Sequence, residues 1–313
     1  MIVEQPRHVV CFSGGHSSAL VAVEVVRRYG TNGVVLLNHD INPRVEDPDV
    51  KRFKREIAAA LGLPITQADH PDVETVDQFD VCEEAGAFKG ASGHVVCTSR
   101  LKTEPFARWL AVNAPPGTAT IYYGFDANET ARIQRRASIL AAQGYESAYP
   151  LAHWPRTLTS TREIGVEPPL TYTQWKHANC VGCLKAGRQH WYVVYCTRPD
   201  VWERAKLAED RIGYTIVNGT SLAELEPQFA EMVRAGVAPT EIVPQQAFWA
   251  DAKRRVRLLV VPEEETRAAI PCECVYRRPG RAAVPPCTCL AGDGEGHALH
   301  CARVLGDDLR RAA

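Results

Sequence analysis

Residues 9–18 carry the sequence VVCFSGGHSS, and this stretch decides the expected fold. A short apolar run, typical of a buried strand, meets two glycines and then small hydroxyl residues that open an apolar helical segment. Backbone N–H groups at the start of such a helix can hold phosphate oxygens. Gly14 and Gly15 would let a ligand approach the backbone closely. An ordinary strand-to-helix turn is the alternative, but the position directly after the first expected strand favours phosphate binding.

Composition limits the class of protein. The chain has 313 residues, of which 45% are hydrophobic, so it can bury a full core. Its net charge of −1 argues against general coating of nucleic acid. No apolar run is long enough for a bilayer and the N-terminus does not resemble a signal peptide, so we expect a cytoplasmic protein with no membrane partner. In that compartment, 11 cysteines indicate metal binding or catalysis before disulfides.

The order of expected elements predicts an α/β protein with a doubly wound, three-layer parallel sheet. We expect strands at 7–12, 33–38, 65–68 and 120–123. We expect helices at 17–29, 47–61, 129–143, 189–197, 199–211 and 221–235, and one that ends at Ala111. Segments 69–100 and 144–172 are expected to be loops. Three domains follow: an α/β nucleotide-binding domain at 1–200, a helical portion at 201–260 and a Cys-rich tail at 261–313.

The segment SGGHSS at 13–18 resembles the SGGxDS PP-loop of the ATP pyrophosphatase, or adenine nucleotide α-hydrolase, superfamily. It departs from that motif at Ser17, where many members carry Asp, and this variation is closest to the PAPS/APS reductase-like branch (phosphoadenosine phosphosulfate reductase family). The resemblance implies an adenine nucleotide α-hydrolase fold with about five parallel strands. It also implies that ATP, or an adenylyl sulfate, lies over the carboxyl ends of the strands. Its phosphates would be held by Ser13, Gly14, Gly15, Ser17 and Ser18, with His16 as a further nucleotide contact.

Two further segments contribute candidate nucleotide-binding residues. His39 and Asp40 follow the second expected strand, at the edge where open α/β sheets bind ligands. Segment 124–132 resembles the G-x-R-x-x-[EQ]-[ST]-x-x-R sequence of the reductase branch, with Asp126 in place of its internal Arg. A solvated basic helix face is the alternative for its arginines. The candidate residues of this second segment are Gly124, Glu129, Arg132 and Arg136.

Cys180 and Cys183 form a CxxC pair, which can bind zinc, bind an iron–sulfur cluster, act as a redox dithiol or pack in a core. Cys97 and Lys102, with a proline three residues further on, resemble the CCxxRKxxPL segment of bacterial APS reductases, whose [4Fe–4S] cluster is completed by a later CxxC. The resemblance implies three ligands, Cys97, Cys180 and Cys183, and catalytic roles for Cys97, Cys183 and Lys102. The second Cys of that motif is replaced by Thr98. Cys82 or Cys196 could supply the fourth thiolate. Without a fourth thiolate, one iron of the cluster would keep an open coordination position.

The tail contains two CxC pairs, formed by Cys272, Cys274, Cys287 and Cys289. Four thiolates on short loops suit tetrahedral zinc, and sulfur relay by a surface cysteine is the competing hypothesis. The ECG-x-H segment that ends PAPS reductases is missing from this tail.

Together these features predict an ATP-dependent sulfurtransferase. It would bind ATP with Mg²⁺, adenylate an acceptor with release of pyrophosphate, and transfer sulfur with a [4Fe–4S] cluster. The alternatives are an APS or PAPS reductase and a non-catalytic, nucleotide-binding accessory protein. Expected partners are a nucleotide, a sulfur donor and an acceptor that is tRNA, DNA or a small molecule. The sequence leaves open whether the chain forms a homodimer.

Overall fold

The computed structural model describes residues 7–91 and 93–260. The chain divides into two compact units, Met1–Arg255 and Val256–Ala313. The first contains all the elements discussed below except the end of one helix. The predicted zinc ligands of the tail, Cys272, Cys274, Cys287 and Cys289, lie outside the described residues, and the domain boundary expected near residue 200 stays a prediction.

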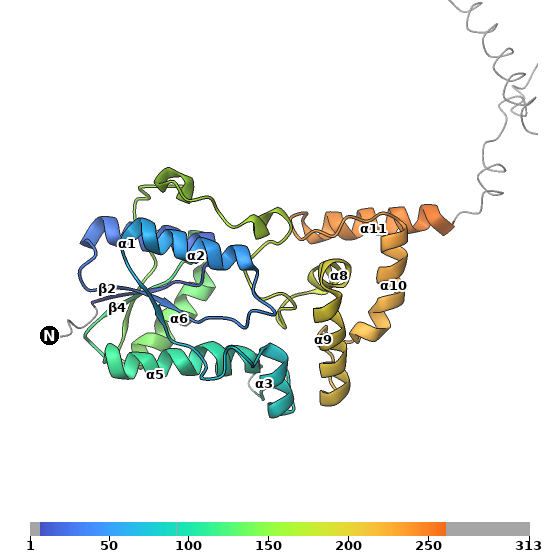
Figure 1. The fold of residues 1–313 in the computed structure, drawn as a ribbon, viewed down its shortest axis with the longest axis horizontal. Coiled ribbons are helices and arrows are strands. Elements are labelled where there is room, and N and C mark those ends of the chain that lie inside the picture. The colour runs from blue at the N-terminus through green and yellow to red at the C-terminus, as the bar shows by residue number, and fades with distance from the viewer. Residues whose placement is uncertain (1–6, 92, 261–313) are drawn as a thin grey trace, which may run out of the picture. The chain divides into compact units, whose positions relative to one another are not determined.

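Unit 1 is built on a five-stranded, all-parallel sheet with the strand order β3-β2-β1-β4-β5 (Figure 1). The strands are β1 (His8–Cys11), β2 (Val34–Asn38), β3 (Ile65–Gln67), β4 (Thr120–Tyr122) and β5 (Glu146–Ala148). The central strands are rich in buried Val, Leu and Ile, as expected for a parallel sheet covered on both faces. The predicted α/β class and parallel sheet are therefore confirmed.

Two apolar cores lie on opposite faces of the sheet and make three layers. Phe12 and Leu36 face the core shared with α1 (His16–Tyr29) and α2 (Pro48–Leu61). Val9 and Ile121 face the core shared with α5 (Glu104–Asn113) and α6 (Thr130–Ala142). Figure 1 shows α1 and α2 above the sheet and α5 below it. Strand order reverses between β1 and β4, which creates the switch point where open α/β sheets bind ligands.

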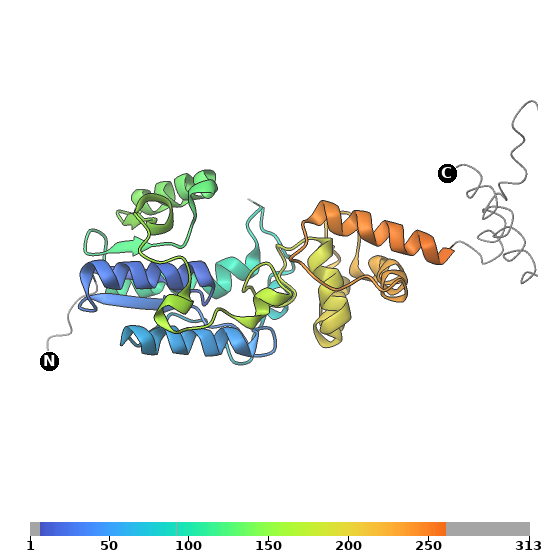
Figure 2. The same cartoon turned by 90° about the horizontal axis from the view of Figure 1, so that it is seen from above.

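The helical remainder of unit 1 packs beside α3 (Gln78–Ala85). It consists of α8 (Arg188–Thr197), α9 (Pro199–Ile212), α10 (Leu222–Arg234) and the first part of α11 (Gln245–Val260). Figure 2 shows α8, α9 and α10 gathered at one side of the sheet. Trp191 and Trp202 are fully buried between α8 and α9, and Arg204 of α9 forms ion pairs with Asp80 and Glu83 of α3.

Two segments expected to be loops contain regular structure, so those expectations were wrong. In 69–100, Asp77 caps α3 through a reciprocal bond with Asp80, a capping box built from two aspartates. In 144–172, β5 is a three-residue edge strand, too short and polar to show a strand pattern, and α7 (Pro150–His153) follows it. No separate helix was predicted at α11, although it lies within the portion at 201–260 that was expected to be helical. Within residues 7–91 and 93–260, no helix combines the length and apolar character needed to cross a bilayer.

Candidate functional site

Residues 13–18 connect β1 to α1 at the carboxyl edge of the sheet. Gly14 has φ +81°, and a Cβ there would lie 2.7 Å from Cγ of Lys54, so both conformation and space require glycine. Ser18 Oγ donates to the carbonyl of Gly15 at 2.7 Å, and Ser13 Oγ donates to Ser18 Oγ at 3.3 Å. Gly15 begins α1 without a side-chain cap. The segment thus has the glycine-dependent turn and the helix start that its sequence predicts, and the helix N-terminus has no side-chain cap.

The tract that follows β5 covers this loop. The Tyr172 hydroxyl accepts the backbone N–H of His16 at 3.0 Å, and a Cβ on Gly15 would lie 3.3 Å from the same oxygen. His16 Nε2 in turn accepts the N–H of Thr161 at 3.3 Å. Burial, assisted by Arg162, lowers the pKa of His16 and so favours the neutral ring that this bond requires. Tyr172 therefore occupies one of the N–H groups that a phosphate oxygen would use.

Segment 124–132 meets the Ser-Gly-Gly loop at the switch point. A Cβ on Gly124 would lie 3.0 Å from the carbonyl carbon of Ser17 and 3.0 Å from the nitrogen of Ser18. These are backbone atoms, which cannot move aside as a flexible side chain could. The two segments identified separately in the sequence thus touch through their backbones, and Gly124 is the residue that permits the approach.

The arginines after β4 differ in what they contact. Arg132 pairs with Glu129 at 2.7 Å, and its guanidinium lies 4.2 Å from the ring centre of Phe125. Arg136 lies 5.4 Å from the ring centre of Tyr123, and within the described part of the chain it forms no ion pair. Glu129 also closes the cap of its own turn. Arg136 is therefore available to an anion, and so is the exposed Arg135, which likewise forms no ion pair among the described residues.

A buried cluster of charged residues packs against the Ser-Gly-Gly loop at Gly14. Sequence analysis missed most of this cluster. Lys54 is 4% exposed, and its Nζ lies 2.8 Å from Glu46 and 3.1 Å from Asp40. It also donates to Asn38 Oδ1 at 3.3 Å, while Lys51 lies 3.3 Å from Asp40. Burial acts to raise the pKa of Asp40, but Lys54 and Lys51 outweigh it and lower that pKa. Asp40, expected to contact a nucleotide, is thus already paired with two lysines.

Four cysteines come together beside the sheet edge. Cys97 donates to Cys82, and this hydrogen bond raises the pKa of Cys97 and lowers that of Cys82. Cys180 donates to Cys183, which lowers the pKa of Cys183 to about 7, with help from the N–H of Lys185. The charge of Cys180 also raises the pKa of Cys97, and the charge of Cys97 raises that of Cys183. The three predicted ligands are therefore neighbours, and Cys82 of α3 joins them.

The alternative fourth cysteine, Cys196, lies elsewhere. Burial raises its pKa, and a hydrogen bond with Tyr192 opposes that rise. Within the described ranges, no group of three or more His, Cys, Asp or Glu side chains is placed to hold a metal ion. The structure thus brings four sulfurs into one neighbourhood without arranging them as ligands of an ion.

Lys102 and His39 connect the cysteines with the strand edge. Hydrogen bonding with Cys183 and burial raise the pKa of Cys180, and the Lys102 ammonium opposes them. Burial lowers the pKa of His39, and Lys102 contributes in the same direction. His39 Nδ1 lies 2.6 Å from the carbonyl of Ala68, so its ring is fixed at the end of β2. Lys102 therefore acts electrostatically on both groups.

The CxxC turn is anchored to the loop that follows β2. The N–H of Val181 donates to the carbonyl of Val45 at 2.8 Å. His190 Nε2 accepts the N–H groups of Gly182 and Cys183, each at 3.2 Å, and its Nδ1 lies 2.9 Å from Glu241. Because Nε2 accepts twice, the proton must lie on Nδ1, and Glu241 fixes that tautomer.

Comparison with models of known protein families finds none that matches this chain, and no curated protein matches it either. The site is therefore defined by its own geometry. Sequence analysis placed its loop, its arginines and three of its cysteines, but missed Tyr172, Lys54 and Glu46. Tyr172 and Lys54 reach the loop from positions distant in the sequence, and the pairing of Lys54 with Glu46 depends on which way the helix faces in the fold.

Proposed function

We propose that the chain is a PP-loop enzyme of the PAPS reductase-like type, with an adenine nucleotide α-hydrolase fold. It binds ATP at the switch point, adenylates an acceptor with release of pyrophosphate, and transfers sulfur with a thiolate-bound [4Fe–4S] cluster. The observation that carries this proposal is the backbone contact of Gly124 with Ser17 and Ser18, beside a group of four cysteines. In this proposal, the phosphate-binding loop and the four cysteines lie at the same edge of a parallel sheet.

On the nucleotide side, phosphate oxygens would accept from the first N–H groups of α1 and from the hydroxyls of Ser13 and Ser17. A phosphate would replace the Tyr172 hydroxyl as acceptor of the His16 N–H. Arg136 would face the pyrophosphate, where a fixed cation stabilises charge that develops as the bond breaks. Since Asp40 is paired with lysines, Mg²⁺ would be held mainly by the phosphates themselves.

On the sulfur side, Cys97, Cys180 and Cys183 would hold the cluster, and the contact with Cys97 favours Cys82 over Cys196 as the fourth ligand. Thiolates are the donors such a cluster requires, and binding releases the protons that the four thiols now share in pairs. The cluster would supply iron sites that bind or deliver sulfur. Lys102, whose charge acts on Cys97, Cys180 and Cys183, would stabilise their thiolate forms.

The reductase alternative is favoured by one specific observation, the pairing of Cys82 with Cys97. Four thiolates would close the cluster, as the paired Cys and CxxC do in the APS reductases that this chain resembles. An adenylyl sulfate would then occupy the same loop. A cysteine thiolate would attack its sulfur, AMP would leave with the bridging oxygen, and a second thiol would release sulfite from the resulting S-sulfocysteine with formation of a disulfide. Which reaction takes place therefore depends on whether Cys82 is a ligand.

Experiments on anaerobically purified protein test both parts of the proposal, the cluster and the nucleotide site. We expect about four iron and four sulfide per chain, lost in Cys183→Ser but retained in Cys196→Ser, the matched control. Retention in Cys82→Ser supports sulfur transfer by a cluster with an open iron, whereas loss in that variant favours the reductase alternative. Calorimetry should show ATP binding that weakens about tenfold in Arg136→Ala and is unchanged in Arg108→Ala, an exposed arginine on α5. Zinc alone or no metal would overturn the cluster. Equal ATP affinity in the two arginine variants would overturn the nucleotide site. The products distinguish the two reactions: ATP-dependent sulfur transfer releases pyrophosphate and then AMP, whereas reduction of an adenylyl sulfate releases AMP and sulfite.

A further inference from the structure

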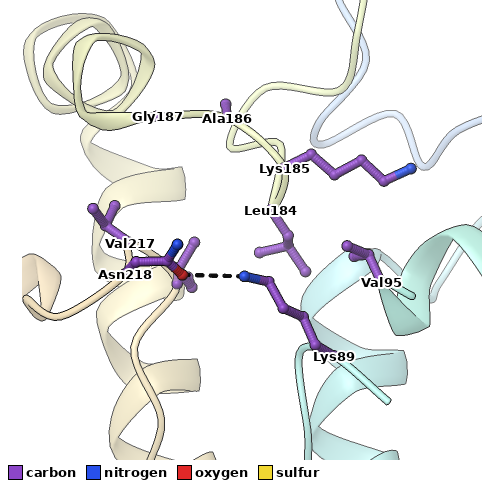
Figure 3. A pocket seen from close by; sticks show the side chains of 9 residues that line it. Lys89, Val95, Leu184, Lys185, Ala186, Gly187, Val217 and Asn218 are labelled. Atoms are coloured by element: carbon purple, nitrogen blue, oxygen red, sulfur yellow. Dashed lines mark hydrogen bonds between the residues drawn. The ribbon is translucent and has the colours of Figure 1, made fainter. Parts of the chain in front are cut away.

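A cavity of about 390 Å³ lies next to the CxxC turn, on the side formed by α8 and the α9–α10 connection. Its walls come from three places: Lys89 and Val95, which pair in an antiparallel bridge, the residues that follow Cys183, and the loop before α10. The lining residues are Lys89, Val95, Leu184, Lys185, Ala186, Gly187, Ile216, Val217 and Asn218 (Figure 3).

The floor of this cavity is apolar. Val95, Leu184, Ile216 and Val217 are each at most 8% exposed. Glu209 holds the loop that carries two of them, since it accepts the N–H of Ile216 at 2.7 Å. The floor is therefore a fixed part of the fold, able to bury an apolar portion of a ligand.

The rim is cationic. Lys89 reaches across the cavity and donates to Asn218 Oδ1 at 3.1 Å, while Lys185 leaves the same loop as Leu184 (Figure 3). Both lysines are exposed, and among the described residues neither forms an ion pair with a carboxylate. Two ammonium groups without a carboxylate partner, placed beside one cavity, favour an anion.

The backbone adds to this charge. α8 begins at the cavity, because Gly187 is its N-cap and lines the wall together with Ala186. This helix has no side-chain cap and no acidic residue in its first turn. Its N-terminal N–H groups and positive dipole end therefore also favour a negatively charged ligand.

We propose that this cavity binds a small organic anion: a carboxylate, sulfonate or phosphate carried on an apolar body. Lys89 and Lys185 bind the charged group, and the apolar floor takes the body. Residues that line the cavity are close in the sequence to two of the four cysteines. Leu184 and Lys185 follow Cys183 directly, and Val95 lies two residues before Cys97. The proposal does not depend on the nucleotide or on the cluster.

Calorimetry with phenyl phosphate, benzenesulfonate, benzoate and inorganic sulfate tests it on the full chain. We expect the aromatic anions to bind and inorganic sulfate to bind more weakly, because it cannot use the floor. Lys89→Ala and Lys185→Ala should each weaken binding about tenfold, whereas Lys253→Ala, an exposed lysine on α11, should leave it unchanged. The three aromatic probes distinguish which charged group is preferred.

Three results would overturn the proposal. They are absence of binding by all aromatic anions, equal affinity in the cavity variants and Lys253→Ala, and binding of neutral benzyl alcohol as tight as that of the anions. Because all three lysines are exposed, the variants should fold, and far-ultraviolet circular dichroism checks this. ATP titration of Lys185→Ala separates this site from the switch point: the two are distinct only if ATP affinity is unchanged.

Discussion

Lys54 offers the sharpest test of how the nucleotide loop is supported. Its ammonium is buried between Glu46 at 2.8 Å and Asp40 at 3.1 Å, and its stem packs under Gly14. Lys54→Met keeps a flexible, unbranched stem of similar length and removes only the charge. Glu46, itself 4% exposed, then loses its nearest cation.

Removing one partner of a buried ion pair costs about 3–5 kcal/mol, because the other charge stays buried. Lys51 remains 3.3 Å from Asp40 and 3.4 Å from Glu46 and compensates in part. We therefore expect Lys54→Met to lower the unfolding free energy by about 3 kcal/mol. Adding Glu46→Leu removes the stranded charge, so the double variant should recover about 2 kcal/mol of that loss.

Urea unfolding followed by tryptophan fluorescence measures these differences. Lys206→Met is the matched control, since this lysine pairs with Glu226 at 2.7 Å but near the surface, where such pairs contribute about 1 kcal/mol or less. The reasoning is refuted if Lys54→Met costs no more than Lys206→Met. It is also refuted if the double variant is as unstable as the sum of its single changes.

Three further results are expected. His190→Ala removes the acceptor of two N–H groups in the CxxC turn. It should lower the free energy of unfolding by about 2–4 kcal/mol and also lower the iron content. Unchanged stability and unchanged iron content would contradict the positioning role of His190. Gly124→Ala places a Cβ 3.0 Å from backbone atoms and should lower stability by about 1–3 kcal/mol and weaken ATP binding, checked by the same unfolding curves and by calorimetry. Burial lowers the pKa of His39 below its ordinary 6.5, so the contribution of the neutral ring to stability is complete above that pH and is lost as the pH falls. The free energy of unfolding should therefore depend less on pH between about pH 7 and about pH 5 in His39→Asn than in the wild type. An equal pH dependence in the two proteins would contradict this.

The parts of the fold that could be predicted are those with local signals. β1 and β2 are continuous apolar runs, and the glycines that follow β1 indicate a turn whatever lies around it. β5 and α3 were missed for opposite reasons. β5 has three residues, two of them polar, and gains its strand geometry only by pairing with β4. α3 had a usable signal, because Asp77 and Asp80 form a capping box, but aspartate replaces the usual Glu or Gln.

The candidate site divides in the same way. Ser13, Gly14 and Cys183 belong to short motifs, so sequence alone identified them. Tyr172 reaches the loop from 156 positions away and lies in a tract with no regular pattern. Lys54 looks like an ordinary surface lysine of an amphipathic helix, and only the fold shows that it points inward at Glu46. Contacts of this kind depend on tertiary structure, which periodicity and spacing do not encode.

The loop after β2 explains why the two halves of the site belong together. Glu46 is held by Lys54, whose stem lies under Gly14, and the neighbouring Val45 accepts the N–H of Val181 inside the CxxC turn. A change in the glycine turn therefore reaches the cysteines through one ion pair and one backbone hydrogen bond. Such a connection couples the sites only if the loop has two arrangements that ligands favour differently. Iron loading that alters ATP affinity in the wild type but not in Lys54→Met would demonstrate that coupling, and equal effects in both proteins would show that the loop is a passive support.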